Sequence, residues 1–122
     1  MSDKFFSYEH LCFTQGGDGL IVVSVALHMA LRLAPTFARL PDPGDRIPAD
    51  VPVGGFESRK ASFELTLPFA CIVSEVNRNV LANPKLIMEG EAEGWLIKVA
   101  AKEEGWKSTL MNERDYGDFI AP

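Results

Sequence analysis

Four prolines fall within the twelve residues 41–52, and this segment constrains the fold more than any other part of the sequence. Each proline lacks an amide hydrogen and has a fixed φ, so the segment can form neither a long helix nor a central strand. We expect a loop here, with at most a short extended piece. Because its composition is too mixed for a linker between domains, we expect the loop to lie within one folded unit.

The residues before the prolines predict two strands and a short helix. Residues 15–19 are rich in glycine and favour a tight turn between a strand at 11–14 and a β-branched strand at 20–25. Alanine and leucine then replace the β-branched residues, which indicates a helix over 26–33. Pro35 ends this helix, because the residue before a proline disfavours helical ψ.

The residues after the prolines are mainly β. Phe63, Leu65 and Leu67 alternate with polar residues, and this period of two places one face of a strand in a core. Many short strands with helices at the edges and C-terminus predict a mainly β sandwich or barrel. The expected elements are strands at 56–58, 61–67, 70–76, 86–87 and 94–99, turns at 77–79 and 82–84, and helices at 102–111 and after a cap at Asn112.

Composition excludes several classes of protein. The chain has 122 residues, of which 47% are hydrophobic, so it is long enough for one core and too short for two domains. Its 12 basic and 17 acidic residues give a net charge of −5, which argues against a nucleic-acid binder. The most apolar run, 19–34, is shorter than a membrane span and contains His28 and Arg32, so we expect no membrane segment.

The residues that could bind metal or form disulfides are few. His10 and His28 lie far apart and lack metal-ligand spacing, so we expect no metal site. Cys12 and Cys71 are expected to be reduced core residues. Together with an N-terminus that does not resemble a secretory signal, they predict a cytoplasmic protein, or an organellar one whose transit peptide has been removed.

Arg59 and Lys60 lie between two expected strands, and this charged turn has two interpretations. It can be an ordinary solvated hairpin tip, in which Glu57 and Glu64 balance the two cations across the strands. Alternatively, the turn presents the amine of Lys60 to an enzyme that acylates it, since a tight turn directs one side chain away from the body.

The surrounding residues favour the second interpretation, because they resemble the glycine cleavage H-protein family over nearly the whole chain. That family has a Glu-Ser-x-Lys-Ala hairpin, which matches Glu57, Ser58, Lys60 and Ala61. The other matching segments, in order, are Glu9-His10, 40–44, Pro68, 75–77, 83–87, 94–98 and 115–119.

The resemblance implies a lipoyl-domain-like hybrid barrel-sandwich, with residues 1–122 forming a single H-protein-like carrier domain. Lipoate would be attached to Lys60 by a lipoate ligase or lipoyltransferase, and the protein itself would have no catalytic residues. It would be a non-catalytic carrier subunit of a multienzyme system, passing an aminomethyl group between partner enzymes. Those partners would be glycine decarboxylase, an aminomethyltransferase and dihydrolipoamide dehydrogenase.

The sequence also departs from the family where the arm would be received. Leu11 stands where the family has a carboxylate, and Leu27 replaces an aspartate beside His28. The remaining polar candidates for an arm pocket are Glu9, His28 and Glu64, although His28 can equally be a packed histidine. The apolar replacements indicate an alternative cargo: sulfur intermediates carried beside a heterodisulfide-reductase-like complex in sulfur oxidation. A third alternative is an unlipoylated interaction module, for which we would expect changes at the 57–61 turn.

Overall fold

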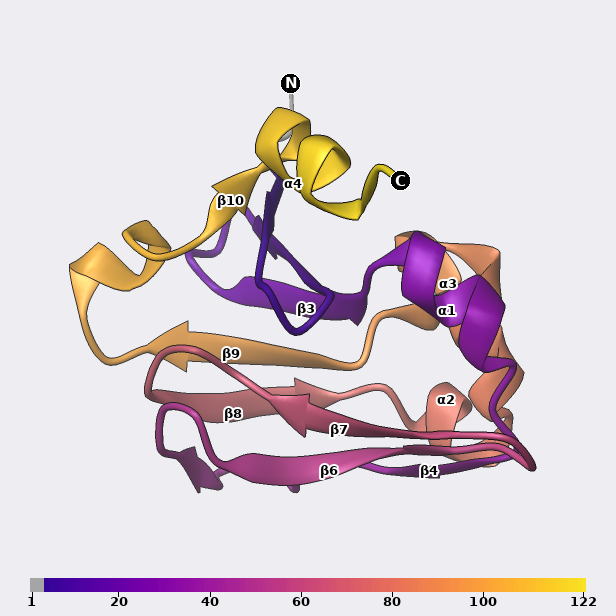
Figure 1. The fold of residues 1–122 in the computed structure, drawn as a ribbon. Helices are drawn as coiled ribbons and strands as arrows, with labels where there is room; N and C mark the ends of the chain where they lie inside the picture. The colour runs from indigo at the N-terminus through magenta and orange to yellow at the C-terminus, as the bar shows by residue number, and fades with distance from the viewer. Residues whose placement is uncertain (1–3) are drawn as a thin grey trace.

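Ten short strands form two antiparallel sheets in the computed structural model, which describes residues 4–122 (Figure 1). The larger sheet has the order β10-β1-β2-β3-β9-β8-β5, and the smaller has the order β4-β6-β7. The strands are β1 (Lys4–Phe6), β2 (Leu11–Gln15), β3 (Ile21–Val25), β4 (Phe37–Arg39), β5 (Arg46–Ile47), β6 (Pro52–Glu57), β7 (Ser62–Thr66), β8 (Cys71–Val76), β9 (Ile97–Ala101) and β10 (Met111–Asn112).

The core lies between the two sheets. Alternate residues of the β-branched strand β3 point into it, with Ile21 and Val23 almost fully buried. The smaller sheet contributes Phe56 and Leu65, which are also almost fully buried. Burying a large apolar side chain stabilises the fold by about 1.5–3 kcal/mol, so this layer supplies much of the driving force for folding. The mainly β class and the sandwich arrangement predicted from the sequence are confirmed.

Four short helical segments lie at one end of the sandwich, at the right in Figure 1. The pairings Val23↔Ile97 and Val76↔Ile97 show why: β3 and β8 end, and β9 begins, at that same end of the larger sheet. The segments that connect these strands are α1 (Leu27–Leu33), α2 (Arg78–Ala82), the 3-10 helix η1 (Pro84–Glu89) and α3 (Glu91–Gly94).

The last helix, α4 (Glu113–Ile120), lies on the outer face of the larger sheet (Figure 1). Asn112 caps it, because the Asn112 side chain accepts a hydrogen bond of 2.7 Å from the amide of Asp115. Tyr116 then closes a second apolar cluster outside the main core, which also contains Phe6, Cys12, Ala26 and Met111.

Most of the expected elements before Val76 are confirmed, including the strands at 11–14 and 20–25 and the helix over 26–33. The helix ends at Leu33, and its C-cap Ala34 adopts a left-handed conformation with φ 41° directly before Pro35. Residues 41–52 form a loop except for the two-residue edge strand β5 and for Pro52, the first residue of β6, where proline is tolerated.

Three expectations for the second half of the chain are wrong. Residues 86–87 belong to η1, since Pro84 occupies its first turn, where a missing amide costs nothing. Residues 77–79 do not form a turn, because Asn77 caps α2. The helix expected at 102–111 is reduced to η2 (Glu104–Lys107), in which Gly105 departs from helical geometry.

The strand expected from residue 94 begins three residues later, at Ile97. The reason is that residues 91–94, which include Glu91 and Glu93, form α3 just before the strand. Sequence analysis also missed the three-residue strands β1 and β4, which are too short to show a period.

Candidate functional site

The turn between β6 and β7 holds Arg59 and Lys60 at the end of the molecule where the short helices lie. Glu57 and Ser62 are the last paired residues of the two strands. The amide of Ser58 donates to the carbonyl of Ala61 at 2.9 Å and closes the turn. The Ser58 hydroxyl accepts hydrogen bonds from the amides of Ala61 at 3.2 Å and Lys60 at 3.4 Å. One serine thus fixes the backbone on which Lys60 is carried.

The base of this hairpin is tightly packed. A Cβ atom at Gly54 would collide with the carbonyl oxygen of Arg39 in β4. A Cβ atom at Gly55 would likewise collide with the carbonyl oxygen of Phe63 in β7. The two glycines let three strands approach closely, with Phe56 buried beside them. The lysine turn therefore stands on a closely packed sheet.

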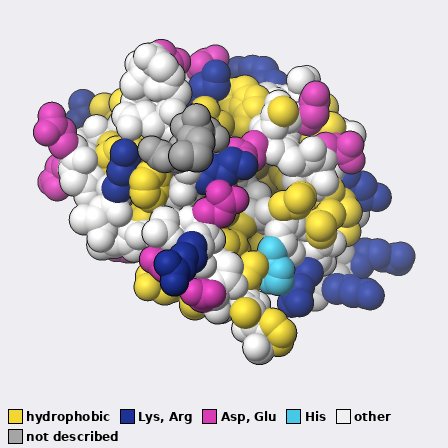
Figure 2. All heavy atoms as spheres, turned by 90° about the horizontal axis from the view of Figure 1, so that it is seen from above, with side chains coloured by type: hydrophobic (Ala, Val, Ile, Leu, Met, Phe, Trp, Pro, Cys, Tyr) yellow, Lys and Arg dark blue, Asp and Glu magenta, His cyan; other side chains and the backbone are white. Residues whose placement is uncertain are grey.

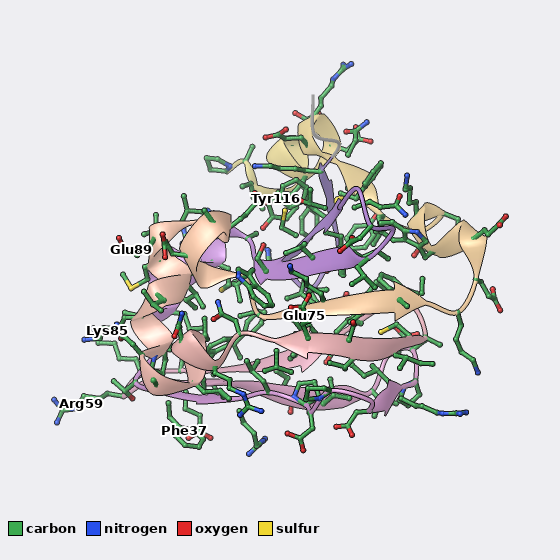
Figure 3. All side chains as sticks on the ribbon, turned by 180° about the vertical axis from the view of Figure 1, so that it is seen from behind. Phe37, Arg59, Glu75, Lys85, Glu89 and Tyr116 are labelled. Atoms are coloured by element: carbon green, nitrogen blue, oxygen red, sulfur yellow. The ribbon has the colours of Figure 1, made fainter. Side chains whose placement is uncertain are left out.

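The side chains of Arg59 and Lys60 are both exposed. Figure 3 shows Arg59 projecting from the corner of the molecule, with Phe37 beside it. Within residues 4–122 the two ion pairs are Lys4–Glu91 at 2.6 Å and Lys98–Glu75 at 3.4 Å. Glu57 and Glu64, which the solvated-tip interpretation would have balance the turn, thus form no ion pair with it in the described chain, and the Lys60 amine is accessible.

The three candidates for the arm pocket do not share one cavity. His28, in the first turn of α1, lines a cavity of about 420 Å³ with Leu27 and Cys12. Glu64 lies opposite Gly55 on β7 and lines a separate hollow of about 120 Å³ on the smaller sheet. Glu9, in the β1–β2 turn, lines neither of these.

Glu9 nevertheless has an unusual environment. Its Oε1 atom is buried and has no hydrogen-bond partner within the described residues. Leaving a buried polar atom of this kind unpaired costs about 1–3 kcal/mol, and more when the group is charged. Such an oxygen is suited to accept a donor that arrives from outside the chain.

His10 lies at the centre of a polar cluster that sequence analysis missed. It adopts a left-handed conformation with φ 67°, and its Nδ1 atom shares a hydrogen bond of 2.8 Å with the hydroxyl of Tyr116. Its ring centroid lies 6.3 Å from that of His28 and 5.9 Å from that of Phe119. Tyr116 comes from α4, 106 residues away, so no local spacing could have revealed the contact.

Burial lowers the pKa of His10, and the nearby His28 and Arg32 lower it further, against a smaller opposing effect of Glu9. The neutral ring is therefore favoured in the folded protein. Cys12, which faces the 420 Å³ cavity, has a pKa raised to about 11, mainly by burial. Its thiol is thus protonated and poorly nucleophilic.

Leu11 does not line a surface pocket, because it is fully buried in the core. Leu27 is 48% exposed. Residues 4–122 contain no group of three or more histidine, cysteine or acidic side chains that could hold a metal ion. No helix among these residues is long and apolar enough to span a membrane.

Two facing sheets, with an exposed lysine on a hydrogen-bonded turn at one end, define a small β-sandwich of the lipoyl-domain type. The family model for glycine cleavage H-protein matches residues 4–122. The chain therefore belongs to the glycine cleavage H-protein family.

Named relatives agree with this membership. The glycine cleavage system H protein of Streptomyces coelicolor is 32% identical over 116 residues, covering 93% of this chain and 91% of that protein. The mitochondrial glycine cleavage system H protein of Drosophila melanogaster is 37% identical over 115 residues, covering 93% of this chain and 69% of that protein.

A solved structure supports the fold. The crystal structure of a glycine cleavage system H protein from Mycobacterium marinum superposes with a TM-score of 0.81, covering 96% of this chain and 95% of that one. The two sequences are 24% identical. The arrangement of the two sheets is thus shared even where the sequences have diverged.

Proposed function

We propose that this protein is a lipoyl carrier of glycine cleavage, with lipoate attached to Lys60. The observation that carries the proposal is the exposed Lys60 amine on a turn fixed by Ser58, in a chain of the H-protein family. We further propose a single carrier domain over residues 1–122, without catalytic residues of its own. The buried, reduced Cys12 and Cys71 support a cytoplasmic location.

The residues at the turn fit such an attachment. Lys60 is exposed and unpaired within the described chain, so a modifying enzyme can reach its amine without breaking a contact. A bound lipoyl group would supply a reversible disulfide–dithiol pair at the end of a long arm. Ser58 and Ala61 hold the backbone beneath it, and Glu57 ends the strand that aims it.

Glu9 supports a cationic cargo. Its buried Oε1, which has no hydrogen-bond partner among residues 4–122, can accept from an ammonium group, and a charge-assisted hydrogen bond would satisfy it. We propose that Glu9 helps to receive the one-carbon amine of glycine cleavage and that His28 lies beside the same region. Glu64 lies on β7 of the smaller sheet, and we propose no role for it beyond the attachment hairpin.

The partners follow from this role: a lipoate ligase or lipoyltransferase, glycine decarboxylase, an aminomethyltransferase and dihydrolipoamide dehydrogenase. The sulfur-oxidation alternative has no support in the named relatives. One of the two residues that indicated it, Leu11, belongs to the core and is absent from the surface.

Intact-mass measurement after expression with a lipoate ligase tests the attachment site. We expect the wild-type protein to gain the mass of one lipoyl group. A Lys60→Arg variant should gain nothing, whereas the matched variant Lys85→Arg, at another exposed lysine, should be modified like the wild type. Modification of Lys60→Arg would place the group elsewhere and overturn the assignment.

The cargo is tested with glycine decarboxylase and glycine. We expect the lipoylated wild type to accept the aminomethyl group, and Glu9→Gln to hold it less tightly while remaining fully lipoylated. The readout is the rate at which the loaded carrier loses its cargo by hydrolysis, measured by mass. Equal loss from Glu9→Gln and wild type would contradict the role of Glu9.

A further inference from the structure

The charged side chains of this acidic protein are distributed unevenly. The end formed by residues 57–61 and the segments α1, α2, η1 and α3 carries five exposed cations against four carboxylates, Glu57, Glu89, Glu91 and Glu93. Because the chain has 12 basic and 17 acidic residues, seven cations and thirteen carboxylates remain for the rest of it. The five cations, which we call the lysyl face, are Arg32, Arg59, Lys60, Arg78 and Lys85.

Topology brings these five residues to one end of the molecule. The amide of Thr36, just after α1, donates to the carbonyl of Glu57 at 2.8 Å, so the end of α1 adjoins the lysine turn. α2 packs against β4, which pairs with β6, and η1 packs against both α1 and α2. In Figure 3, Arg59 and Lys85 project from the same end as Phe37. Figure 2 shows Lys and Arg side chains projecting at this same end, which is on the right in Figure 1.

None of the five cations takes part in either ion pair of the described residues. Arg78 is the first residue of α2 and Lys85 the second of η1, positions where a helix dipole favours acidic residues. Neither local helix stability nor a partner within the described chain therefore accounts for the positive charge. Next to them, Glu91 of α3 is neutralised by Lys4, while Glu57 and Glu93 are exposed.

Apolar side chains are exposed among the cations. Leu27 and Leu31, one turn apart on α1, are 48% and 54% exposed, and Phe37 is 53% exposed. Leu81 of α2 is exposed as well. Exposed apolar side chains near arginines match the composition typical of protein–protein interfaces.

We infer that the lysyl face is a docking surface for enzymes whose active-site entrances are surrounded by aspartate and glutamate. The inference rests on the proposed function, because an arm on Lys60 can enter an active site only if the surface around Lys60 meets its entrance. A basic face on an acidic protein orients the carrier as it approaches: the lysyl face is attracted to the carboxylates while the rest of the chain is repelled.

The test compares two double charge reversals with equal effects on net charge. Arg78→Glu with Lys85→Glu changes the lysyl face, and glutamate suits both helix starts, so these variants should fold. Arg46→Glu with Lys102→Glu is the matched control at the opposite end, where β5 and the start of β8 lie. Lipoylated carriers serve as the varied substrate of glycine decarboxylase, and kcat/KM is measured from low to high salt.

We expect the lysyl-face pair to lower kcat/KM at low salt by about tenfold and to flatten its salt dependence, with kcat unchanged. The control pair should stay within about twofold of the wild type. An equal loss of kcat/KM in both double variants would mean that only the net charge matters. A higher kcat/KM in the lysyl-face variant would mean that the entrance to the decarboxylase active site is basic. Either result overturns the inference.

Docking is also measured without the arm. Lys60→Gln is neutral, as an acylated lysine is, and should inhibit the reaction competitively. Combining Lys60→Gln with the Arg78→Glu and Lys85→Glu changes should remove the inhibition. Combining it with the control changes, Arg46→Glu and Lys102→Glu, should not. If wild-type Lys60 is not lipoylated, the proposed function fails. If it is lipoylated but the two pairs behave alike, the docking surface alone fails.

Discussion

The hydrogen bond between Tyr116 and His10 fastens the C-terminal helix to the β1–β2 turn, and Tyr116→Phe isolates its energy. The change removes only the hydroxyl, since a phenylalanine ring can keep the stacking on Phe6, whose centroid lies 4.4 Å away. A hydrogen bond of 2.8 Å in a partly buried site contributes about 0.5–1.5 kcal/mol. Since 1 kcal/mol shifts the melting temperature of a domain of this size by about 3–6 °C, we expect unfolding at about 2–9 °C lower temperature.

Tyr8→Phe is the matched control, because Tyr8 is the chain's other tyrosine and is 58% exposed. It touches Phe119 edge-on at 5.2 Å, a contact that phenylalanine keeps. Urea unfolding of Tyr116→Phe, His10→Asn and the double variant completes a double-mutant cycle. Asparagine replaces His10 because it tolerates the left-handed φ of this position. Additive effects, or equal losses from both tyrosine changes, would refute the role given to this bond.

Four further outcomes are expected. His28→Ala should raise the pKa of His10 toward its ordinary value, because His28 helps to depress it; an unchanged NMR titration would contradict this. Since the folded state favours neutral His10, the unfolded state binds more protons, and stability should fall as pH drops through about 6.5, less so in His10→Asn. Burial raises the pKa values of the Cys12 and Cys71 thiols to about 11 and about 12, so both should react with a thiol reagent at pH 8 only after unfolding. Fast labelling of the native protein would contradict this burial. Gly55→Ala should destabilise the fold by more than about 1 kcal/mol, because its Cβ collides with backbone of β7, and an unchanged urea midpoint would count against that packing.

Local sequence patterns predicted the elements whose structure depends on the periodic burial of their own side chains. The β-branched residues of β3 and the alternation ending at Leu67 form strands because their packing depends on the period of the side chains. Residues 86–87 and 102–111 were misread because Pro84 and Gly105 determine the backbone there more strongly than apolar content does.

The candidate site was predictable in part, for the same reason. The Lys60 turn depends on adjacent residues, so its motif was visible in the sequence. The cluster around His10 depends on α4 and α1 meeting in space, and Glu9 becomes unusual only because its Oε1 is buried there. Leu11 looked like a pocket residue by position, but its side chain points into the core.

The lysyl face changes when Lys60 is acylated, because the reaction replaces an ammonium with a neutral amide. One of its five cations disappears, and the net charge moves from −5 to −6. If the proposed docking is correct, an enzyme that attaches the group through an acidic entrance would bind its substrate more tightly than its product. Product release would then be favoured by the loss of one charge, and the finished carrier would meet its next partner with four cations on this face.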